Sequence, residues 1–152
     1  MNRITVANVV SMSVVVCAFV PLFVRTLGTV TAGLAILALA VESMKVLVGS
    51  NSSWSRRPAG ASDCGLWCAE GAVGGTPGWP SGHMAVATAL VVFFLVRNRD
   101  RERTKWAVGI GIGWLAMVAW ARWVKRCHTQ GQIVAGGVVG CVGGLGLAWA
   151  LR

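Results

Sequence analysis

Two histidines are the only imidazoles in this chain of 152 residues, and each stands in a polar cluster next to an apolar run. The first, His83, ends the string GWPSGH (78–83) and begins an apolar stretch, so we expect it at a helix N-terminus. Backbone amides and the helix dipole favour an anion there, and an imidazole can donate a proton to it. The simpler interpretation is that Ser81 caps a helix and His83 is an interfacial side chain.

The second histidine lies in the basic string RWVKRCHTQGQ (122–132), between two further apolar runs. Arg122 is expected where one helix ends. His128 and Gln132 are four residues apart, which places them on one face of the next helix. A basic turn of this kind also serves as a simple anchor for lipid headgroups.

A third cluster begins at Lys45, near the end of an apolar run, and continues with Arg56, Arg57 and Pro58. Glu42 precedes Lys45 by three residues, so the two are expected to pair. A lysine close to a helix end can instead extend its ammonium group to the membrane surface. Both interpretations stay open at this point.

The order of the apolar runs predicts that the three clusters emerge on one face of the membrane. Together they would supply a lysine, two arginines, two imidazoles and a helix N-terminus. Cations that bind nonbridging oxygens, one imidazole that attacks phosphorus and another that protonates the leaving group are the requirements of phosphoryl transfer. The clusters therefore point to chemistry on a phosphate.

The composition indicates an integral membrane protein. Hydrophobic residues make up 55% and charged residues 12% of the chain, the net charge is +9 and the mean hydropathy is +0.67. This mix excludes a disordered chain, a coiled coil and a soluble nucleic-acid binder. About five runs suit membrane-crossing helices, so we predict an all-α polytopic bundle forming a single membrane domain over 1–152, with spans near 4–24, 28–48, 82–96, 106–124 and 131–151.

The segments between these runs predict the orientation. The hairpin 97–105 carries five positive and two negative residues, which marks the cytosolic side. The N-terminus, the loop 49–81 and the turn 125–130 then fall on the non-cytosolic side. The loop 49–81 is rich in Gly, Ser, Pro and Trp, so we expect it at the membrane interface, where it carries part of the site. The first run is expected to be a retained helix rather than a cleaved signal peptide.

Cysteines and glycines give weaker signals. Cys64 and Cys68 either form a disulfide or stay as two free thiols. Cys17 and Cys141 lie in apolar runs and are expected to be small packing residues. Glycines repeat every fourth residue in two runs, which predicts close helix packing at two sets of positions: Gly109 and Gly113, and Gly136, Gly140 and Gly144.

These residues resemble the type 2 phosphatidic acid phosphatases, or lipid phosphate phosphatases, which are related to the vanadium haloperoxidases. The family pattern is Lys, six residues, Arg-Pro; then Pro-Ser-Gly-His; then Ser-Arg, five residues, His, three residues, Asp. Residues 80–83 match the middle motif, and Arg122 and His128 match the third at the correct spacing. Eleven residues separate Lys45 from Arg57, Ala121 replaces the serine, and Gln132 replaces the aspartate. The family commonly has six membrane helices, and this chain has about five runs.

The resemblance implies a lipid phosphomonoester or diphosphate as substrate and a role in lipid metabolism, with no metal, cofactor or nucleic acid. His128 would attack phosphorus to form a phosphohistidine, and His83 would protonate the leaving oxygen. The phosphate would be held by Lys45, Arg57, Arg122 and the amides near Ser81 and Gly82. Gln132 can accept a hydrogen bond from His128 but cannot offset the charge of an imidazolium. A comparable carboxylate-to-amide change costs about four orders of magnitude, so weak or absent turnover is expected.

Two alternatives stay open. One is a catalytically degenerate relative that binds a lipid headgroup or acts as a structural membrane protein without turnover. The other is a metal site drawn from the residues Cys64, Cys68, His83, Cys127 and His128, whose spacing is poor for one ion. Asp63 or Glu70 would be a substitute for the missing aspartate if the loop brought either carboxylate to His128.

Overall fold

The computed structural model describes residues 2–19, 28–65, 70–98 and 100–151, and it confirms the predicted all-α fold. Within these residues there are five helices and no named strand, and the order along the chain is α1 (Arg3–Phe19), α2 (Gly28–Val48), α3 (Gly82–Arg97), α4 (Arg101–Val124) and α5 (Gln130–Ala150). The apolar runs therefore predicted α2 and α5 to within one residue at each end. The predicted first span continues to residue 24, and residues 20–27 lie outside the described part of the chain.

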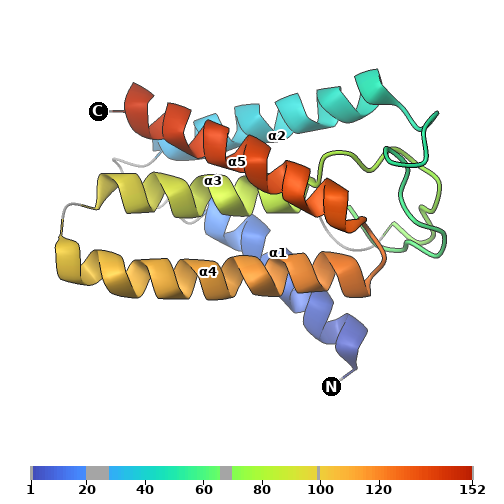
Figure 1. The fold of residues 1–152 in the computed structure, drawn as a ribbon, viewed down its shortest axis with the longest axis horizontal. Helices are drawn as coiled ribbons and strands as arrows, with labels where there is room; N and C mark the ends of the chain where they lie inside the picture. The colour runs from blue at the N-terminus through green and yellow to red at the C-terminus, as the bar shows by residue number, and fades with distance from the viewer. Residues whose placement is uncertain (1, 20–27, 66–69, 99, 152) are drawn as a thin grey trace.

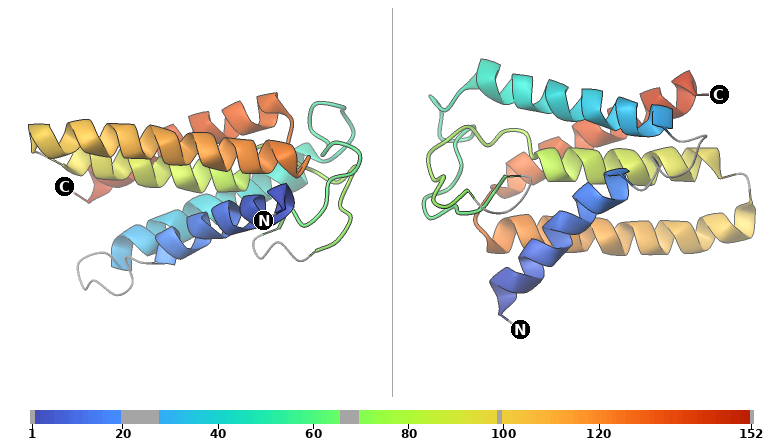
Figure 2. Two further views of the ribbon diagram at one scale, coloured as in Figure 1. Left: turned by 90° about the horizontal axis from the view of Figure 1, so that it is seen from below. Right: turned by 180° about the vertical axis from the view of Figure 1, so that it is seen from behind.

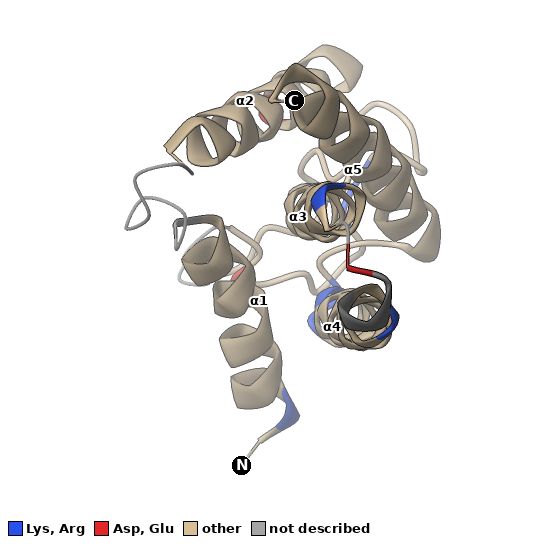
Figure 3. Ribbon diagram, turned by 90° about the vertical axis from the view of Figure 1, so that its left-hand side faces the viewer, with Lys and Arg blue, Asp and Glu red and all other residues tan. Residues whose placement is uncertain are grey.

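Helix α3 is the centre of the bundle. Viewed along the bundle, it is surrounded by the other four helices (Figure 3). The loop 49–81 and the turn between α4 and α5 lie at the same end of the molecule, on the right in Figure 1, and the turn from α3 to α4 lies at the other end (Figures 1 and 2). The prediction that the three polar clusters meet at one end of the bundle is therefore confirmed.

Three of the helices are long and apolar enough to cross a membrane: Gly28–Val48, Thr104–Val124 and Gln130–Ala150. Large apolar side chains stand exposed on the outer faces of these helices, including Ile36, Leu39, Ile110, Val138 and Trp149. Apolar side chains on the outside and a polar site at one end are typical of a protein whose solvent is the bilayer. The chain is thus a membrane protein. Helices α1 and α3 are shorter, so five crossings stay a prediction.

The glycine pattern of α5 allows it to pack closely on α3. A Cβ atom added at Gly136, Gly140 or Gly144 would overlap the carbonyl oxygen of Ser81, Ala85 or Ala89. The predicted packing role of these glycines is confirmed. The same prediction is wrong for Gly109 and Gly113 of α4, which have no atom within 4 Å of an added Cβ among the described residues.

We expect Gly140→Ala to destabilise the bundle by about 1–3 kcal/mol, because the added methyl group must push α5 away from the α3 backbone. The matched variant Gly109→Ala adds the same methyl group in open space and is expected to be neutral or to stabilise α4 by up to about 1 kcal/mol. Thermal unfolding of both variants in one detergent measures the difference. Equal melting temperatures would contradict the assigned packing.

Helix α1 is attached to α4 by polar contacts inside the bundle. The Trp114 indole donates a hydrogen bond to the Ser13 hydroxyl at 3.0 Å, and Arg122 donates one to the Ser11 hydroxyl at 2.9 Å.

The two cysteines predicted to be packing residues, Cys17 and Cys141, are exposed, so that prediction is wrong. A small apolar side chain is as stable against lipid as it is inside the bundle, so an apolar run alone does not show which face of the helix is buried.

Candidate active site

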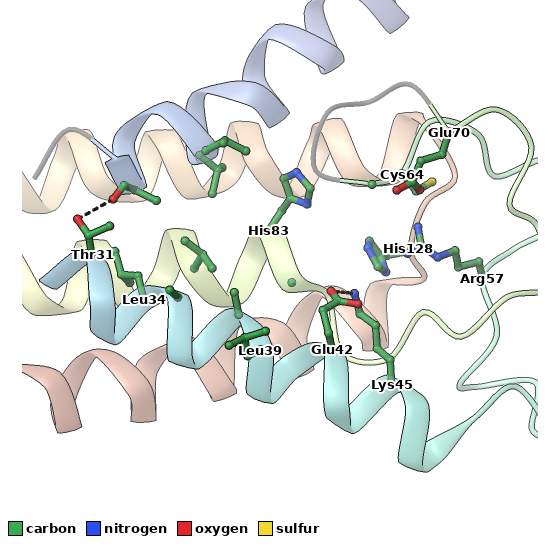
Figure 4. Close-up of a pocket in the computed structure, with 18 residues that line it drawn as sticks. Thr31, Leu34, Leu39, Glu42, Lys45, Arg57, Cys64, Glu70, His83 and His128 are labelled. Carbon is green, nitrogen blue, oxygen red and sulfur yellow. Dashed lines mark hydrogen bonds and ion pairs between the residues drawn. The ribbon is translucent and has the colours of Figure 1, made fainter. Parts of the chain in front are cut away.

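A cavity of about 590 Å³ opens at the end of the bundle where the loop 49–81 meets the helices. Its walls come from α1, α2, α3, the loop and the turn before α5 (Figure 4). Five of the eight site residues predicted from the sequence line it, namely Lys45, Arg57, Gly82, His83 and His128. The other three, Ser81, Arg122 and Gln132, lie behind its wall.

His83 reaches the cavity from the first turn of α3. Its side chain is 8% exposed, and its Nε2 atom is buried with no hydrogen-bond partner among the described residues. The Ser81 side chain makes no capping hydrogen bond, so it leaves the first amides of the helix uncapped. The Ser81 amide itself donates to the carbonyl oxygen of Gln132 at 3.0 Å. The Ser81 amide is therefore already paired, while Gly82 borders the cavity, and phosphate binding by the amides near Ser81 and Gly82 stays a prediction.

His128 lies between α4 and α5 and is 2% exposed. Its Nδ1 atom is 2.9 Å from the carbonyl oxygen of Gly78 and 3.3 Å from Oε1 of Gln132. Both neighbours are acceptors, so Nδ1 must carry the proton when the ring is neutral. The lone pair is then on Nε2, which is the state that a nucleophilic imidazole requires.

The charge state of His128 is set by its surroundings. Burial holds the pKa of His128 well below its ordinary value of 6.5, and the positive charges of Arg122, Arg57 and Lys45 lower it further. The hydrogen bond with Gln132 acts in the opposite direction. Because the pKa is depressed, the folded protein keeps this ring neutral at pH values where a free histidine would already be protonated.

We expect the ring of His128 to titrate below pH 6.5, the ordinary value. The variant His83→Ala leaves His128 as the single histidine, so its ring nitrogens can be followed by NMR in micelles as the pH falls. Since the unfolded chain binds this proton first, the stability that depends on His128 is lost as the pH drops below 6.5. A midpoint at or above 6.5 in the folded protein would contradict the assigned burial.

Gln132 is 1% exposed, and every hydrogen-bonding atom of its side chain is used. Its Oε1 atom accepts from the Thr129 amide at 3.2 Å and contacts His128 Nδ1. Its Nε2 atom donates to the carbonyl oxygens of Trp54 at 2.9 Å and Arg56 at 2.7 Å. The residue also completes a capping box with Thr129, which stabilises the start of α5. One side chain therefore caps the helix, binds the loop and contacts the histidine.

The cations of the cavity come from distant parts of the chain. Lys45 at the end of α2 is buried and pairs with Glu42 at 2.5 Å, as predicted from their spacing. Arg57 comes from the loop and donates through Nε to the carbonyl oxygen of Pro77 at 3.3 Å. Its Nη1 atom is buried and has no partner within the described chain. The eleven-residue spacing therefore does not prevent Lys45 and Arg57 from lining one cavity.

Burial lowers the pKa of the Arg57 guanidinium, whereas the nearby carboxylates of Glu70 and Glu42 raise it. Arginine has an ordinary pKa so high that the group stays protonated. A permanent cation therefore faces the cavity from the loop.

Arg122 does not line the cavity, although the third motif predicted it as a phosphate ligand. Its side chain is fully buried, and it donates to the Ser11 hydroxyl and to the carbonyl oxygen of Cys64 at 2.6 Å. Lys125 donates in the same way to the carbonyl oxygen of Asp63. These two cations bind the loop to the end of α4. From behind the wall, the charge of Arg122 acts on both histidines and that of Lys125 acts on His83.

A disulfide joins Cys64 to Cys127, with the two Cα atoms 5.4 Å apart. Cys64 is therefore neither free nor paired with Cys68, so both predictions for it are wrong; Cys68 itself lies outside the described residues. Sequence proximity suggested the wrong partner because the loop folds back onto the turn before α5. Two of the thiols proposed as metal ligands are consumed by this bond, and the described residues hold no group of three metal-ligating side chains.

The two loop carboxylates do not replace the missing aspartate. Asp63 accepts hydrogen bonds from the Gly71 amide at 2.9 Å and the Ser62 hydroxyl at 3.0 Å, and these bonds lower its pKa. Glu70 borders the cavity on the side of Cys64 (Figure 4). In the described structure the acceptors at Nδ1 of His128 are those of Gly78 and Gln132.

A family model described as the PAP2 superfamily matches residues 26–152. The chain belongs to the PAP2 superfamily. No curated protein and no solved structure matches it. The matched region includes both histidines and all the cations of the cavity, and membership in this superfamily supports a phosphatase-type function in general.

Sequence reasoning missed the backbone groups of this PAP2 site. The Gly78 carbonyl oxygen is the nearest acceptor to His128 Nδ1, and the carbonyl oxygens of Trp54 and Arg56 hold Gln132. A backbone acceptor has no side-chain signature, so no motif could reveal it. The structure explains the glycine at this position, because an added Cβ at Gly78 would lie 2.7 Å from Arg57 Cγ and 2.9 Å from Gln132 Oε1.

Proposed function

We propose that the protein is a lipid phosphate phosphatase that hydrolyses a phosphomonoester or diphosphate without a metal, through a phosphohistidine on His128. One observation carries the proposal. Arg57 Nη1 and His83 Nε2 are buried and have no hydrogen-bond partner among the described residues, yet both side chains line the cavity that holds His128 and Lys45. Buried polar groups normally find partners, so these two suit an anion with several oxygens.

The phosphate would lie between the loop and the start of α3. Arg57 and Lys45 supply positive charge, and the N-terminus of α3 at Gly82 adds the partial charge of its amides. A phosphate would also compete with Glu42 for Lys45, since the two are paired in the structure. Arg122 and Lys125 contribute charge from behind the wall while they hold the loop in place.

The reaction follows from the two imidazoles. His128 Nε2 attacks phosphorus, the bond from phosphorus to the leaving oxygen breaks, and His83 gives its proton to that oxygen. Water then attacks the phosphohistidine, His83 takes a proton from the water, and inorganic phosphate leaves with His128 neutral again. Gly78 and Gln132 act as positioning groups, because they hold the Nδ1 proton and thereby keep the lone pair on Nε2.

Phosphate release from a panel of lipid phosphates by the purified protein, with a chelator present, tests this proposal. We expect turnover in the chelator and inhibition by vanadate, which mimics the five-coordinate phosphorus. Headgroup binding without any release would favour the degenerate relative. Turnover that depends on added zinc would contradict a mechanism without a metal.

We further propose that the site faces the non-cytosolic side. The disulfide between Cys64 and Cys127 lies at this end of the bundle, and disulfides persist in oxidising compartments. The opposite end carries the basic hairpin 97–105. A membrane-impermeant thiol reagent should label Ser53→Cys from outside intact cells and should label Asp100→Cys only after lysis. The reverse pattern would overturn the orientation.

A further inference from the structure

Glu42 places a carboxylate at the cationic end of the cavity. It lies three residues before Lys45 on α2, both side chains line the cavity, and the carboxylate oxygen Oε1 is 2.5 Å from Lys45 Nζ. Figure 4 shows the pair on the α2 side of the cavity, across from the side chains of His83 and His128. An anion of the protein itself therefore lies in the region where the phosphate would bind.

The carboxylate lies against the start of α3. A Cβ atom added at Gly82 would be 3.5 Å from Glu42 Oε1 and 3.6 Å from Lys45 Nζ. The Ser81 side chain makes no capping hydrogen bond there, and an uncapped helix N-terminus attracts negative charge. The carboxylate also raises the pKa of the Arg57 guanidinium. Glu42 thus has the neighbours that the proposed function gives to a phosphate.

The protein holds the two partners of this ion pair to different degrees. The Lys45 side chain is 9% exposed, whereas that of Glu42 is 64% exposed. Among the described residues, Lys45 is the only hydrogen-bond partner of the Glu42 carboxylate. An exposed ion pair is weak, and a phosphate group carries a charge of about −1.5 to −2 near pH 7 on three strong acceptor oxygens. The carboxylate can therefore turn into the open cavity when a phosphate binds, while the buried lysine stays in place.

We propose that Glu42 is an internal competitor of the phosphate for Lys45. Its carboxylate binds Lys45 in the empty site, leaves it when the phosphate of the substrate binds, and returns when inorganic phosphate departs. A tethered group competes at an effective concentration on the order of millimolar, so it opposes tight binding of the product. The inference rests on the proposed function for the binding of phosphate at Lys45. If Glu42 served only to position Lys45, its loss would instead weaken phosphate binding.

Product inhibition tests the direction of this effect. Glu42→Gln keeps the size of the side chain and removes its charge. We expect it to lower the inhibition constant of inorganic phosphate at least about fivefold during hydrolysis of hexadecyl phosphate. The control Asp100→Asn removes a carboxylate between α3 and α4, at the opposite end of the bundle, and should change this constant less than about twofold. An unchanged or higher inhibition constant in Glu42→Gln would overturn the inference.

A binding measurement separates this inference from the proposed function. Methylphosphonate has no ester bond to hydrolyse, so its calorimetric titration reports affinity alone. We expect it to bind Glu42→Gln at least about fivefold more tightly than the wild type. Tighter binding without phosphate release from any lipid phosphate would overturn the proposed phosphatase and leave the competitor standing. Normal release with unchanged or weaker binding would overturn the competitor alone.

A second background separates competition from a general effect of charge. In Lys45→Met there is no ammonium group to compete for, so adding Glu42→Gln should change the dissociation constant of methylphosphonate less than about twofold. A carboxylate that only repelled the phosphate through its field would act equally with and without the lysine. An equal gain in affinity in both backgrounds would therefore exclude an internal competitor.

Discussion

We expect His128→Ala to lower kcat for phosphate release by at least about 10³-fold, because it removes the nucleophile and leaves only the electrostatic binding of the phosphate. The segment around the ring keeps other anchors, since the Gly78 amide donates to the carbonyl oxygen of Ser55 at 2.7 Å and the Gln132 side chain donates to that of Trp54 at 2.9 Å. The fold should therefore survive the change. Steady-state release of inorganic phosphate from hexadecyl phosphate measures the effect.

The control is Arg126→Ala, which removes an exposed cation two residues away that does not line the cavity. We expect it to change kcat less than about twofold, as usual for surface positions. The variant His128→Ala should also fail to acquire a phosphoryl group when it is denatured with acid or base after mixing with substrate. Residual turnover within tenfold of the wild type would exclude His128 as the nucleophile.

The role of His83 can be separated from that of His128 by the leaving group. General acid catalysis contributes about 10²–10⁴-fold, and it matters only where the leaving oxygen needs a proton. We therefore expect His83→Ala to lose most of its activity on an alkyl phosphate but much less on p-nitrophenyl phosphate. Equal losses on both substrates would mean that His83 binds phosphate rather than protonates the leaving group.

The second large effect is expected at Gln132. From sequence alone, Gln132→Asp restores the family carboxylate and should raise the rate. The structure reverses this expectation. An aspartate cannot donate to the carbonyl oxygens of Trp54 and Arg56, and it would place a buried negative charge against both. Each buried group left unpaired costs about 1–3 kcal/mol, so we expect lower stability and no gain in kcat.

The test compares Gln132→Asp with Gln132→Glu, which keeps the length of the side chain and also removes both donors. We expect both variants to melt at lower temperature than the wild type and to bind the loop less firmly. Limited proteolysis within 49–81 reports the loop, and phosphate release reports the chemistry. A rise in kcat for Gln132→Asp with an unchanged melting temperature would show that the missing carboxylate limits the enzyme.

The local sequence motifs predicted which cationic and imidazole side chains form the site. Lys45, Arg57, His83 and His128 were predicted to gather, and they do line one cavity, because the order of the spans fixes which helix ends share a face. Lys45 and Arg57 line one cavity although their spacing departs from the family pattern. A loop can absorb extra residues at little cost, since closure entropy grows only slowly with loop length.

The sequence alone determined the helices, the end of the bundle that carries the polar clusters and the superfamily. Apolar runs, helix-end residues and contiguous motifs are local, so they can be recognised without knowing which elements touch. Only the tertiary structure showed which side chains and backbone groups of the site bind one another. It pairs Cys64 with Cys127, turns Arg122 and Lys125 towards loop carbonyls, and gives His128 a backbone acceptor at Gly78. These contacts join residues about fifty or more positions apart, and backbone carbonyls, which every residue carries, leave no mark in the sequence that would reveal them.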